Sequence, residues 1–395
     1  MTPSLVSPGP RFGWKTLRPG QPRSEMPPPF NTAPTHYVFS GRTAIFHGLR
    51  VLGISAGESV LVPAFNCASL VEPIRRHGAR ATFYKVNSDC SPDFDDLVRR
   101  IDAKTRAVVA LHYFGFPQPL TRFRDLCLER GLYLIEDCAH VLAGGSASTP
   151  LGVTGDISIF SWRKFLPVCD GGQLVINNPT LIADIRLDKP NIVVRVKAVK
   201  DVVDRTLYDS PNALARCLTH LSRVPSIVRR NLHWKSTLGA GSPMAPRHDS
   251  DEFDLGYPFT IVNLPMSPIA RFVVDHIDLR PIIERRRHNY LYILKILGSL
   301  PGVIPLFRDL PEGVCPLAFP FFVEGREDFH LVLRSKGIPA STWGGVIHPD
   351  LPLEEFPESR TLYEKLISLP VHQSLSVDEM NTMERAMQDA LAGSA

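Results

Sequence analysis

The 395-residue sequence has little of what marks membrane, secreted or nucleic-acid-binding proteins. No apolar run approaches the roughly 20 residues that a membrane-spanning helix needs, and the N-terminus has no apolar leader stretch. The net charge is only +4, which is too weak to predict nucleic acid as the main partner. We therefore expect a cytoplasmic protein that acts on small molecules.

Cysteine is also scarce, and its spacing predicts neither a disulfide framework nor a zinc site. The seven cysteines are odd in number and form no pair of CxxC motifs, and none lies in a cluster of histidines. A disulfide framework and a zinc site normally require such spacings. We expect no metal and mostly buried, reduced thiols.

The remaining composition is that of an ordinary globular protein, with 44% hydrophobic and 21% charged residues. At the usual domain size of about 100 to 200 residues, the length predicts about two domains. Residues 1–35 are an exception, since they hold nine of the 36 prolines and few aliphatic residues. Such a composition buries too little surface to offset its ordering entropy, so we expect an extended arm.

Short β-branched runs alternate with helical stretches from residue 36 onward, a pattern typical of βα units around a buried, mostly parallel sheet. We therefore predict an α/β large domain over residues 36–265. Within it, residues from about 185 to 250 have helical spacing and excess Arg and Lys. This basic insertion is either a solvated subunit contact or a surface for an acidic ligand or a membrane. Residues 266–395 are predicted to form an interdomain helix and a small α+β C-terminal domain.

Three motifs in the large domain carry chemistry. Ser40–Ile45 opens an amphipathic helix, whose free N–H groups either bind an anion or are simply capped. Asp137 and His140 follow a predicted strand, where an acid either holds a cationic ring nitrogen or caps the next helix. Ser161 and Lys164 follow the next strand, and Lys164 is either a desolvated Schiff-base amine or a surface lysine. In this order, the motifs supply the parts of a pyridoxal phosphate site.

The stretch from Ser40 to Gly172, with Asn263–Ser267 and Leu369–His372, resembles the DegT/DnrJ/EryC1/StrS family of pyridoxal-phosphate sugar aminotransferases. The resemblance implies fold type I, the aspartate-aminotransferase fold, with a mixed seven-stranded sheet and a small C-terminal domain. It also implies a homodimer with shared active sites. The implied reaction moves an amino group from glutamate or glutamine to a keto sugar, normally nucleotide-linked, with pyridoxal 5′-phosphate as cofactor.

The same resemblance assigns roles to individual residues. Lys164 would form the Schiff base and move the proton, Asp137 would bind the pyridinium nitrogen, and His140 would lie beside the cofactor. The phosphate would be held by the helix start and by a serine, and a further residue would reach in from the partner subunit; these are Gly41, Thr43, Ala44, Ser161 and Asn263. Glu136 should point to the opposite face of the strand from Asp137.

Three departures from the family pattern argue against a standard nucleotide-sugar substrate. Cys67 stands where an aromatic residue usually covers the cofactor ring, so that Phe65 or His112 would have to substitute for it. The interval from Ser161 to Lys164 is two residues shorter than usual. Pro265 replaces the arginine of the interface motif.

Two other functions remain open: a different pyridoxal-phosphate reaction, such as dehydration, oxidation or carbon–nitrogen bond formation, and a cofactor-binding sensor or scaffold. The first would exploit the altered cofactor wall, although family dehydratases replace the lysine by histidine. Arg42 and Arg163 are either helix-start and turn residues or bind a substrate carboxylate or diphosphate. Trp343, His348 and His372 are interpreted as structural, the last as a support for the final helix.

Overall fold

The computed structural model describes residues 5–11, 28–31, 33–145, 149–189, 192, 195–196, 198–200, 202, 261–298, 300–343 and 346–392. Most of the Pro-rich arm and of the predicted basic insertion lies outside these residues. Within the described ranges, no helix is both long enough and apolar enough to cross a bilayer.

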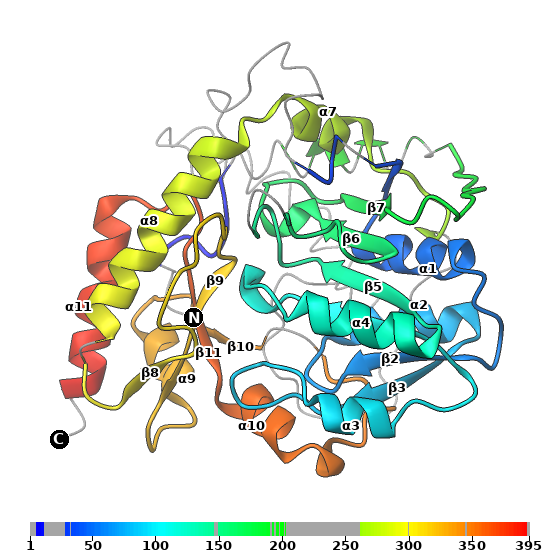
Figure 1. Ribbon diagram of the computed structural model, residues 1–395. Coiled ribbons are helices and arrows are strands. Elements are labelled where there is room, and N and C mark those ends of the chain that lie inside the picture. Colours follow the sequence, from blue (N-terminus) through cyan, green and yellow to red (C-terminus); the bar gives the residue numbers. More distant parts are fainter. Residues whose placement is uncertain are drawn as a thin grey trace, which may run out of the picture.

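A large sheet forms the centre of the N-terminal half (Figure 1). Its seven described strands follow the order β1-β7-β6-β5-β4-β2-β3, and β7 runs antiparallel to both of its neighbours. Strands β2, β6 and β7 are buried along their whole length, as their near-continuous apolar sequences predict. The bounds are β1 (Thr35–Val38), β2 (Ser59–Pro63), β3 (Arg80–Tyr84), β4 (Thr105–Leu111), β5 (Tyr133–Cys138), β6 (Ile157–Ser161) and β7 (Gly172–Ile176).

Helices cover both faces of this sheet, with α1 and α2 on one side and α3 and α4 on the other (Figure 1). Local sequence sets their ends. Asp93 caps α3 by accepting the Asp96 N–H, and α4 ends at Gly131, which has the left-handed conformation that favours glycine. The bounds are α1 (Gly41–Val51), α2 (Ala68–His77), α3 (Phe94–Arg99) and α4 (Leu120–Arg130); short 3₁₀ turns, η3 (Tyr113–Gly115) and η4 (Trp162–Lys164), follow β4 and β6.

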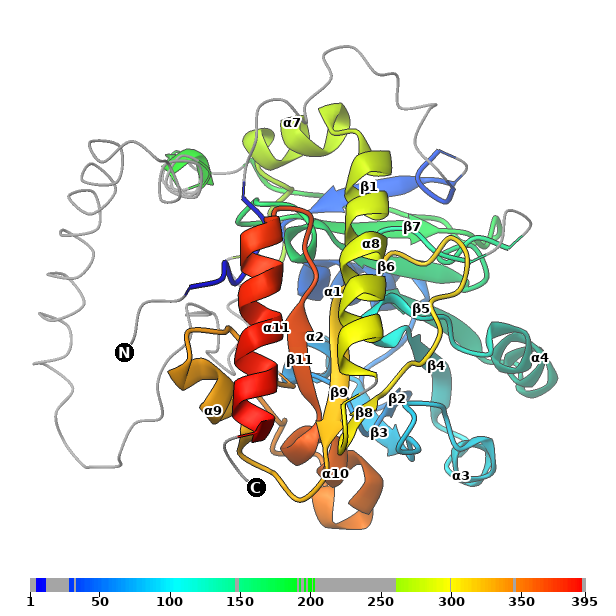
Figure 2. The same ribbon diagram turned by 90° about the vertical axis from the view of Figure 1, so that its left-hand side faces the viewer.

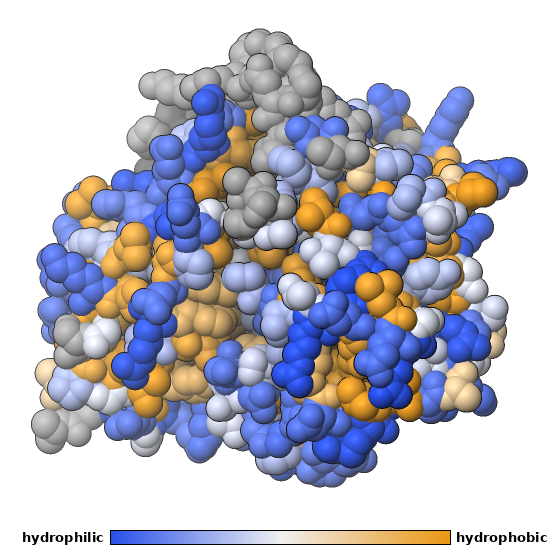
Figure 3. Space-filling view, viewed as in Figure 1, coloured by the Kyte–Doolittle hydropathy of each residue, from blue (hydrophilic) through white to orange (hydrophobic). Residues whose placement is uncertain are grey.

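A second, antiparallel sheet of order β10-β11-β9-β8 builds the small domain. Helices α8 and α11 lie side by side on this domain (Figure 2). Apolar patches lie between hydrophilic ones on the face of the molecule that Figure 3 shows. The bounds are α7 (Pro268–His276), α8 (Leu279–Leu297), β8 (Val303–Pro305), β9 (Ala318–Val323), α9 (Phe329–Ser335), β10 (Ser341–Thr342), η6 (Leu353–Glu355), α10 (Pro357–Lys365), β11 (Ile367–Pro370) and α11 (Val377–Ala392).

Some side chains in the described parts of the N-terminal arm are buried against the body, although the composition of residues 1–35 predicts little burial there. Val6 and Phe30 are only 1% and 2% exposed. The Ser7 N–H donates to Glu379 Oε1 at 2.9 Å, and His372 Nε2 lies 2.9 Å from the Ser7 carbonyl oxygen. His372 therefore holds the N-terminal segment, whereas the sequence interpretation made it a support for the last helix. A few apolar side chains in a Pro-rich stretch are enough to anchor it where a complementary surface exists.

Candidate active site

The predicted chemical residues come together at the carboxyl ends of neighbouring strands. Asp137 lies at the end of β5, and Ser161 is the last residue of β6, which pairs with β5 in parallel. Lys164 follows directly in the turn η4. The start of α1 also reaches this edge, because a Cβ placed on Gly41 would lie 3.9 Å from the Ser161 Cβ. Ligands of open α/β sheets bind at this edge.

Close contact between α1 and β7 fixes the position of the helix start. Ser161 pairs with Gly172 of β7, and a Cβ at Gly172 would lie only 2.1 Å from the Ser40 carbonyl carbon and oxygen. Only glycine allows the backbone of the helix start to pass so near the strand. The start of α1 and the side chain of Ser161 are thereby placed side by side.

The hydrogen bonds of α1 correct one predicted phosphate contact. The Ala44 N–H already donates to the Ser40 carbonyl oxygen at 3.0 Å, as the first bond of the helical ladder. Only the N–H groups before it lack a partner of this kind, so Ala44 is not a phosphate donor. The Thr43 N–H donates to the Ser40 hydroxyl at 3.3 Å, a long capping bond. Gly41 lies in the first turn of α1, where the backbone N–H groups have no partner within the helix.

Asp137 is a buried carboxylate with an open acceptor. It is 5% exposed, and its Oδ1 accepts the Ala139 N–H at 2.8 Å. Within the described chain, Oδ2 accepts no hydrogen bond. Burial raises the pKa of Asp137, although the Ala139 N–H and the positive charge of Lys164 act in the opposite direction. A cationic N–H donor at Oδ2 would relieve this cost.

Lys164 has the properties of a reactive amine. Burial lowers the pKa of Lys164, against the opposing influence of Asp137 and Cys67. These side chains are thus close enough to affect one another's charge, yet Lys164 and Asp137 form no ion pair in the described structure.

His140 faces the same region as a neutral ring. Its Nδ1 accepts the Phe114 N–H at 3.2 Å, so the ring proton is on Nε2. Phe114 has a left-handed conformation (φ 55°), uncommon for a large side chain, which aims this N–H at the histidine. Burial holds the pKa of His140 well below its usual range. The residue offers a fixed donor at Nε2 and carries no charge near neutral pH.

An aromatic cluster beside His140 shows whether Phe65 can stack on a cofactor ring. Phe65 is fully buried, with its ring 5.3 Å from that of Tyr113 and 4.4 Å from that of Trp343. Phe65 therefore has no free face for a cofactor, which corrects its prediction as a stacking residue. Cys67 is partly exposed and lies within electrostatic reach of Lys164.

Sequence reasoning missed the position of Trp343. This indole lies just after β10 of the small domain, with its ring 5.4 Å from that of His140 and its Nε1 donating to the Asn66 carbonyl oxygen at 3.2 Å. It was interpreted as structural because nothing in the local sequence relates it to residues two hundred positions earlier. Its indole N–H bond to Asn66 and its contacts with several aromatic rings place Trp343 at the site, and these contacts exist only in the folded chain.

Glu136 and His112 form a separate buried pair. His112 Nε2 lies 3.1 Å from Glu136 Oε1, and the Glu136 carboxylate also accepts N–H groups from residues 152–155. Burial alone would raise the pKa of Glu136, but the histidine and these amides outweigh it and lower that pKa. Glu136 therefore holds the 152–155 loop. His112 is fully buried between Glu136 and the Gln118 N–H, so it does not serve as the cofactor wall. His112, Glu136 and Cys138 form a buried group of potential metal ligands. Both carboxylate oxygens of Glu136, however, already accept hydrogen bonds from His112 and the 152–155 amides.

Asn263 lies beside α1 and β1 of its own subunit. The segment around it bonds to α1 and to the residue after β1: the Phe39 N–H donates to the Leu264 carbonyl, and His47 Nε2 lies 2.9 Å from the Val262 carbonyl oxygen. The Asn263 carbonyl accepts the Asp188 N–H at 2.7 Å. No hydrogen bond engages its side-chain amide in the described chain, which leaves that amide for another contact.

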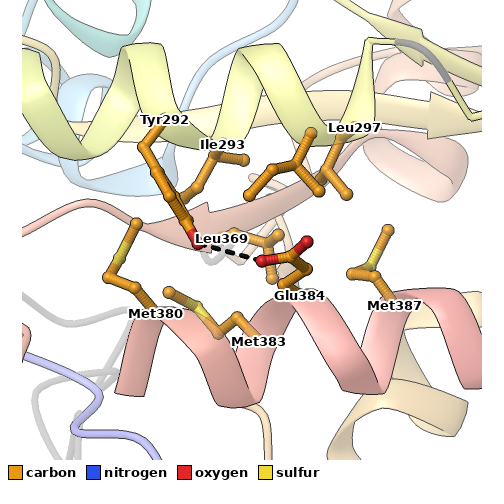
Figure 4. Close-up of a pocket in the computed structure, with 9 residues that line it drawn as sticks. Tyr292, Ile293, Leu297, Leu369, Met380, Met383, Glu384 and Met387 are labelled. Carbon is orange, nitrogen blue, oxygen red and sulfur yellow. Dashed lines mark hydrogen bonds between the residues drawn. The ribbon is translucent and has the colours of Figure 1, made fainter. Parts of the chain in front are cut away.

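The hollow between α8 and α11 is unrelated to this site (Figure 4). Apolar side chains line it, among them three methionines of α11, and Tyr292 closes it by donating to Glu384 Oε2 at 2.9 Å. None of the predicted site residues contributes to its wall. It is a packing seam of the small domain.

Comparison with known proteins decides the family. The model of the DegT/DnrJ/EryC1/StrS aminotransferase family matches residues 36–207. A dTDP-4-dehydro-2,3,6-trideoxy-D-glucose 4-aminotransferase of Saccharopolyspora spinosa is 36% identical over 371 residues, which make up 91% of this chain and 85% of the relative. This chain belongs to the DegT/DnrJ/EryC1/StrS aminotransferase family. A GDP-perosamine synthase of Vibrio cholerae is 31% identical over 222 residues, 54% of this chain and 60% of that enzyme.

Solved aminotransferase structures share the fold. A Helicobacter pylori aminotransferase involved in the biosynthesis of pseudoaminic acid superimposes with a TM-score of 0.65 at 16% identity, over 96% of this chain and 93% of that one. A Bacillus subtilis protein with bound cofactor PMP gives a TM-score of 0.63 at 15% identity, over 96% and 79%. The predicted family and fold type are thus confirmed, and with them the aminotransferase class.

Proposed function

We propose that this aminotransferase transfers an amino group from glutamate or glutamine to a nucleotide-linked keto sugar, for a surface polysaccharide or a glycosylated metabolite. The observation that carries the proposal is the meeting of Asp137, Ser161 and Lys164 at one sheet edge, in a chain related along most of its length to a nucleotide-sugar aminotransferase. Cys67 and Pro265, two of the three departures from the family pattern, favour an acceptor that differs from those of its relatives.

The residues at this edge fit pyridoxal phosphate. When bound, the cofactor serves as an electron sink for the bond broken in the substrate. The open Oδ2 of Asp137 would keep the ring nitrogen protonated, since a buried carboxylate favours a cationic partner. The start of α1 and the Ser161 hydroxyl would bind the phosphate. His140 Nε2–H would orient the ring by donating to one of its oxygens.

Lys164 would hold the cofactor covalently and move the substrate proton. Burial lowers the pKa of its amine, which raises the fraction of neutral nucleophile near pH 7. The amine and the Asp137 carboxylate lie on one sheet edge but form no ion pair, so the amine is free to act.

We also propose a homodimer with shared sites. The support is the position of Asn263, whose side-chain amide bonds to no described residue of its own subunit and whose motif matches one that the family donates across the interface. Mixing Lys164→Ala and Asn263→Ala subunits should restore activity in the mixed dimer, because one of its two sites then lacks both defects. Recovery of no activity, with mixed dimers present, would exclude sharing through Asn263.

Absorption spectroscopy tests the cofactor assignment. The protein with added pyridoxal phosphate should show a visible or near-ultraviolet band that borohydride fixes, with the mass increase on the peptide carrying Lys164. Lys164→Ala should lose both the fixation and transamination while remaining folded. A mass increase on another lysine would refute the assignment.

A screen of amino donors against this band, followed by keto-sugar nucleotides as acceptors, then tests the reaction. Loss of the band with glutamate or glutamine and its return with a keto sugar support the proposal. Failure of every donor would favour the sensor or scaffold alternative.

A further inference from the structure

A buried arginine of α8 lies against the turn that carries Lys164. Arg286 is 1% exposed, and its guanidinium carbon lies 4.8 Å above the ring of Phe165, the residue after Lys164. Burial lowers the pKa of Arg286 to about 10, so it stays charged at neutral pH. No carboxylate pairs with it in the described ranges; its acceptors are Gln373 and the carbonyl groups of Pro316 and Leu317.

A cation without a counter-ion is expensive inside a protein, and hydrophobic replacement of such groups is often neutral for stability. Here the charge is spread over three neutral acceptors and an aromatic face. This arrangement fixes the guanidinium in one place, and that place adjoins the lysine turn.

Gln373 links Arg286 to Phe165 by two hydrogen bonds. Its Oε1 accepts from Arg286 Nε at 2.9 Å, and its Nε2 donates to the Phe165 carbonyl oxygen at 2.8 Å. The arginine can only donate, so it fixes which end of the amide faces it. The NH₂ group of Gln373 is thereby directed at Phe165. Phe165 is held at its carbonyl by Gln373 and at its ring by Arg286.

Phe165 in turn determines where Lys164 can lie. The turn is short, with the Phe165 and Leu166 N–H groups both donating to the Trp162 carbonyl oxygen at 3.0 and 2.8 Å. A shift of Phe165 therefore moves the backbone of Lys164, to which it is joined by one peptide bond.

We propose that Arg286 and Gln373 are positioning residues that hold the Lys164 turn against the small domain. The proposal rests on the function assigned to Lys164 above. Its consequence is that the small domain, which supplies Gln373, sets the orientation of the reactive amine in the large domain. Positioning of this kind matters because displacements of about 1 Å at a reacting group can cost about a hundredfold in rate.

Two substitutions at Gln373 separate its two bonds. Gln373→Glu keeps an acceptor for Arg286 but cannot donate to Phe165. Gln373→Leu removes both bonds without adding charge. Asn289→Leu is the matched control, because Asn289 Nδ2 donates to the carbonyls of Val371 and His372 in the same segment but does not contact Phe165.

The readouts use the protein without cofactor, so they do not depend on the proposed reaction. Amide hydrogen exchange should accelerate at least tenfold in the peptide containing residues 162–166 for both Gln373 variants, and stay near wild type for Asn289→Leu. The Lys164 amine, followed by NMR after reductive methylation, should titrate at higher pH in both variants as water reaches it. Asp137, Cys67 and Arg163 also act on this amine and are unchanged in every variant.

The cofactor-loaded enzymes provide the last comparison: kcat should fall about tenfold or more in both Gln373 variants, with KM for the amino donor little changed. Unchanged exchange at residues 162–166 and an unchanged Lys164 titration in folded Gln373→Glu would overturn the positioning role. Equal acceleration in Asn289→Leu would overturn it too, because it would show only a general loosening. If wild type forms no lysine-linked cofactor, the proposed function fails, while the exchange and titration results still decide the positioning role.

Discussion

Replacing Gly172 by alanine tests whether the contact between β7 and α1 builds the phosphate site. The new Cβ would lie 2.1 Å from the Ser40 carbonyl atoms and 2.7 Å from the Gly41 nitrogen, whereas real Cβ contacts are essentially never under 3.0 Å. These are backbone atoms, so no side-chain rotation relieves the clash. The start of α1 has to move away from β7 by about 1 Å.

The expected cost follows from what that shift disturbs. Overpacking of this kind typically costs about 1–3 kcal/mol of unfolding free energy, and loss of the Ser40 cap would add about 1 kcal/mol. A helix start displaced from Ser161 would also lose at least one charge-assisted bond to phosphate, worth about 1.5–3 kcal/mol. Cofactor affinity should therefore fall about 10- to 100-fold.

Urea unfolding of the cofactor-free protein and cofactor titration measure the two effects. Pyridoxal without its phosphate should lose far less affinity than pyridoxal phosphate, because the disturbed contacts belong to the phosphate. Gly41→Ala is the stability control, since its Cβ meets only the Ser161 Cβ at an ordinary 3.9 Å. Gly172→Ala with wild-type stability and wild-type affinity for pyridoxal phosphate would refute the reasoning.

Three further predictions concern buried titratable groups. Asp137→Asn should bind cofactor but turn over about a hundredfold more slowly or worse, a loss of about 3 kcal/mol at about 1.4 kcal/mol per tenfold; single-turnover rates check this. Glu136→Gln should lower unfolding free energy by about 1–3 kcal/mol and flatten its pH dependence below pH 4.5, since a carboxylate of lowered pKa loses its stabilising effect as pH falls through that pKa; unchanged acid unfolding would contradict this. Burial lowers the pKa of His372 from 6.5 to about 4, so unfolding free energy should drop by up to about 3 kcal/mol as pH falls between these values. His372→Gln, which keeps a donor for Ser7, should remove that drop in denaturant titrations at pH 7, 5.5 and 4.

The order of the chemical motifs along the chain was enough to predict the sheet edge. An apolar run that predicts a buried strand precedes each of Asp137, Ser161 and Lys164. The carboxyl ends of parallel strands meet at one edge of a sheet. The start of α1 at Ser40 and Gly41 is likewise a local property, because helix capping depends on neighbours in sequence. Local propensity and chain order therefore determined the fold class and the sheet edge at which these residues meet.

The wall of the site and the support of its lysine were decided by tertiary contacts. Phe65 was available for stacking until Tyr113 and Trp343 covered it, and Trp343 comes from a segment 278 residues further along the chain. The bond from Gln373 to Phe165 spans 208 residues. Such contacts depend on how the small domain is seated on the large one, and the packing of two surfaces leaves no periodic trace in either sequence segment.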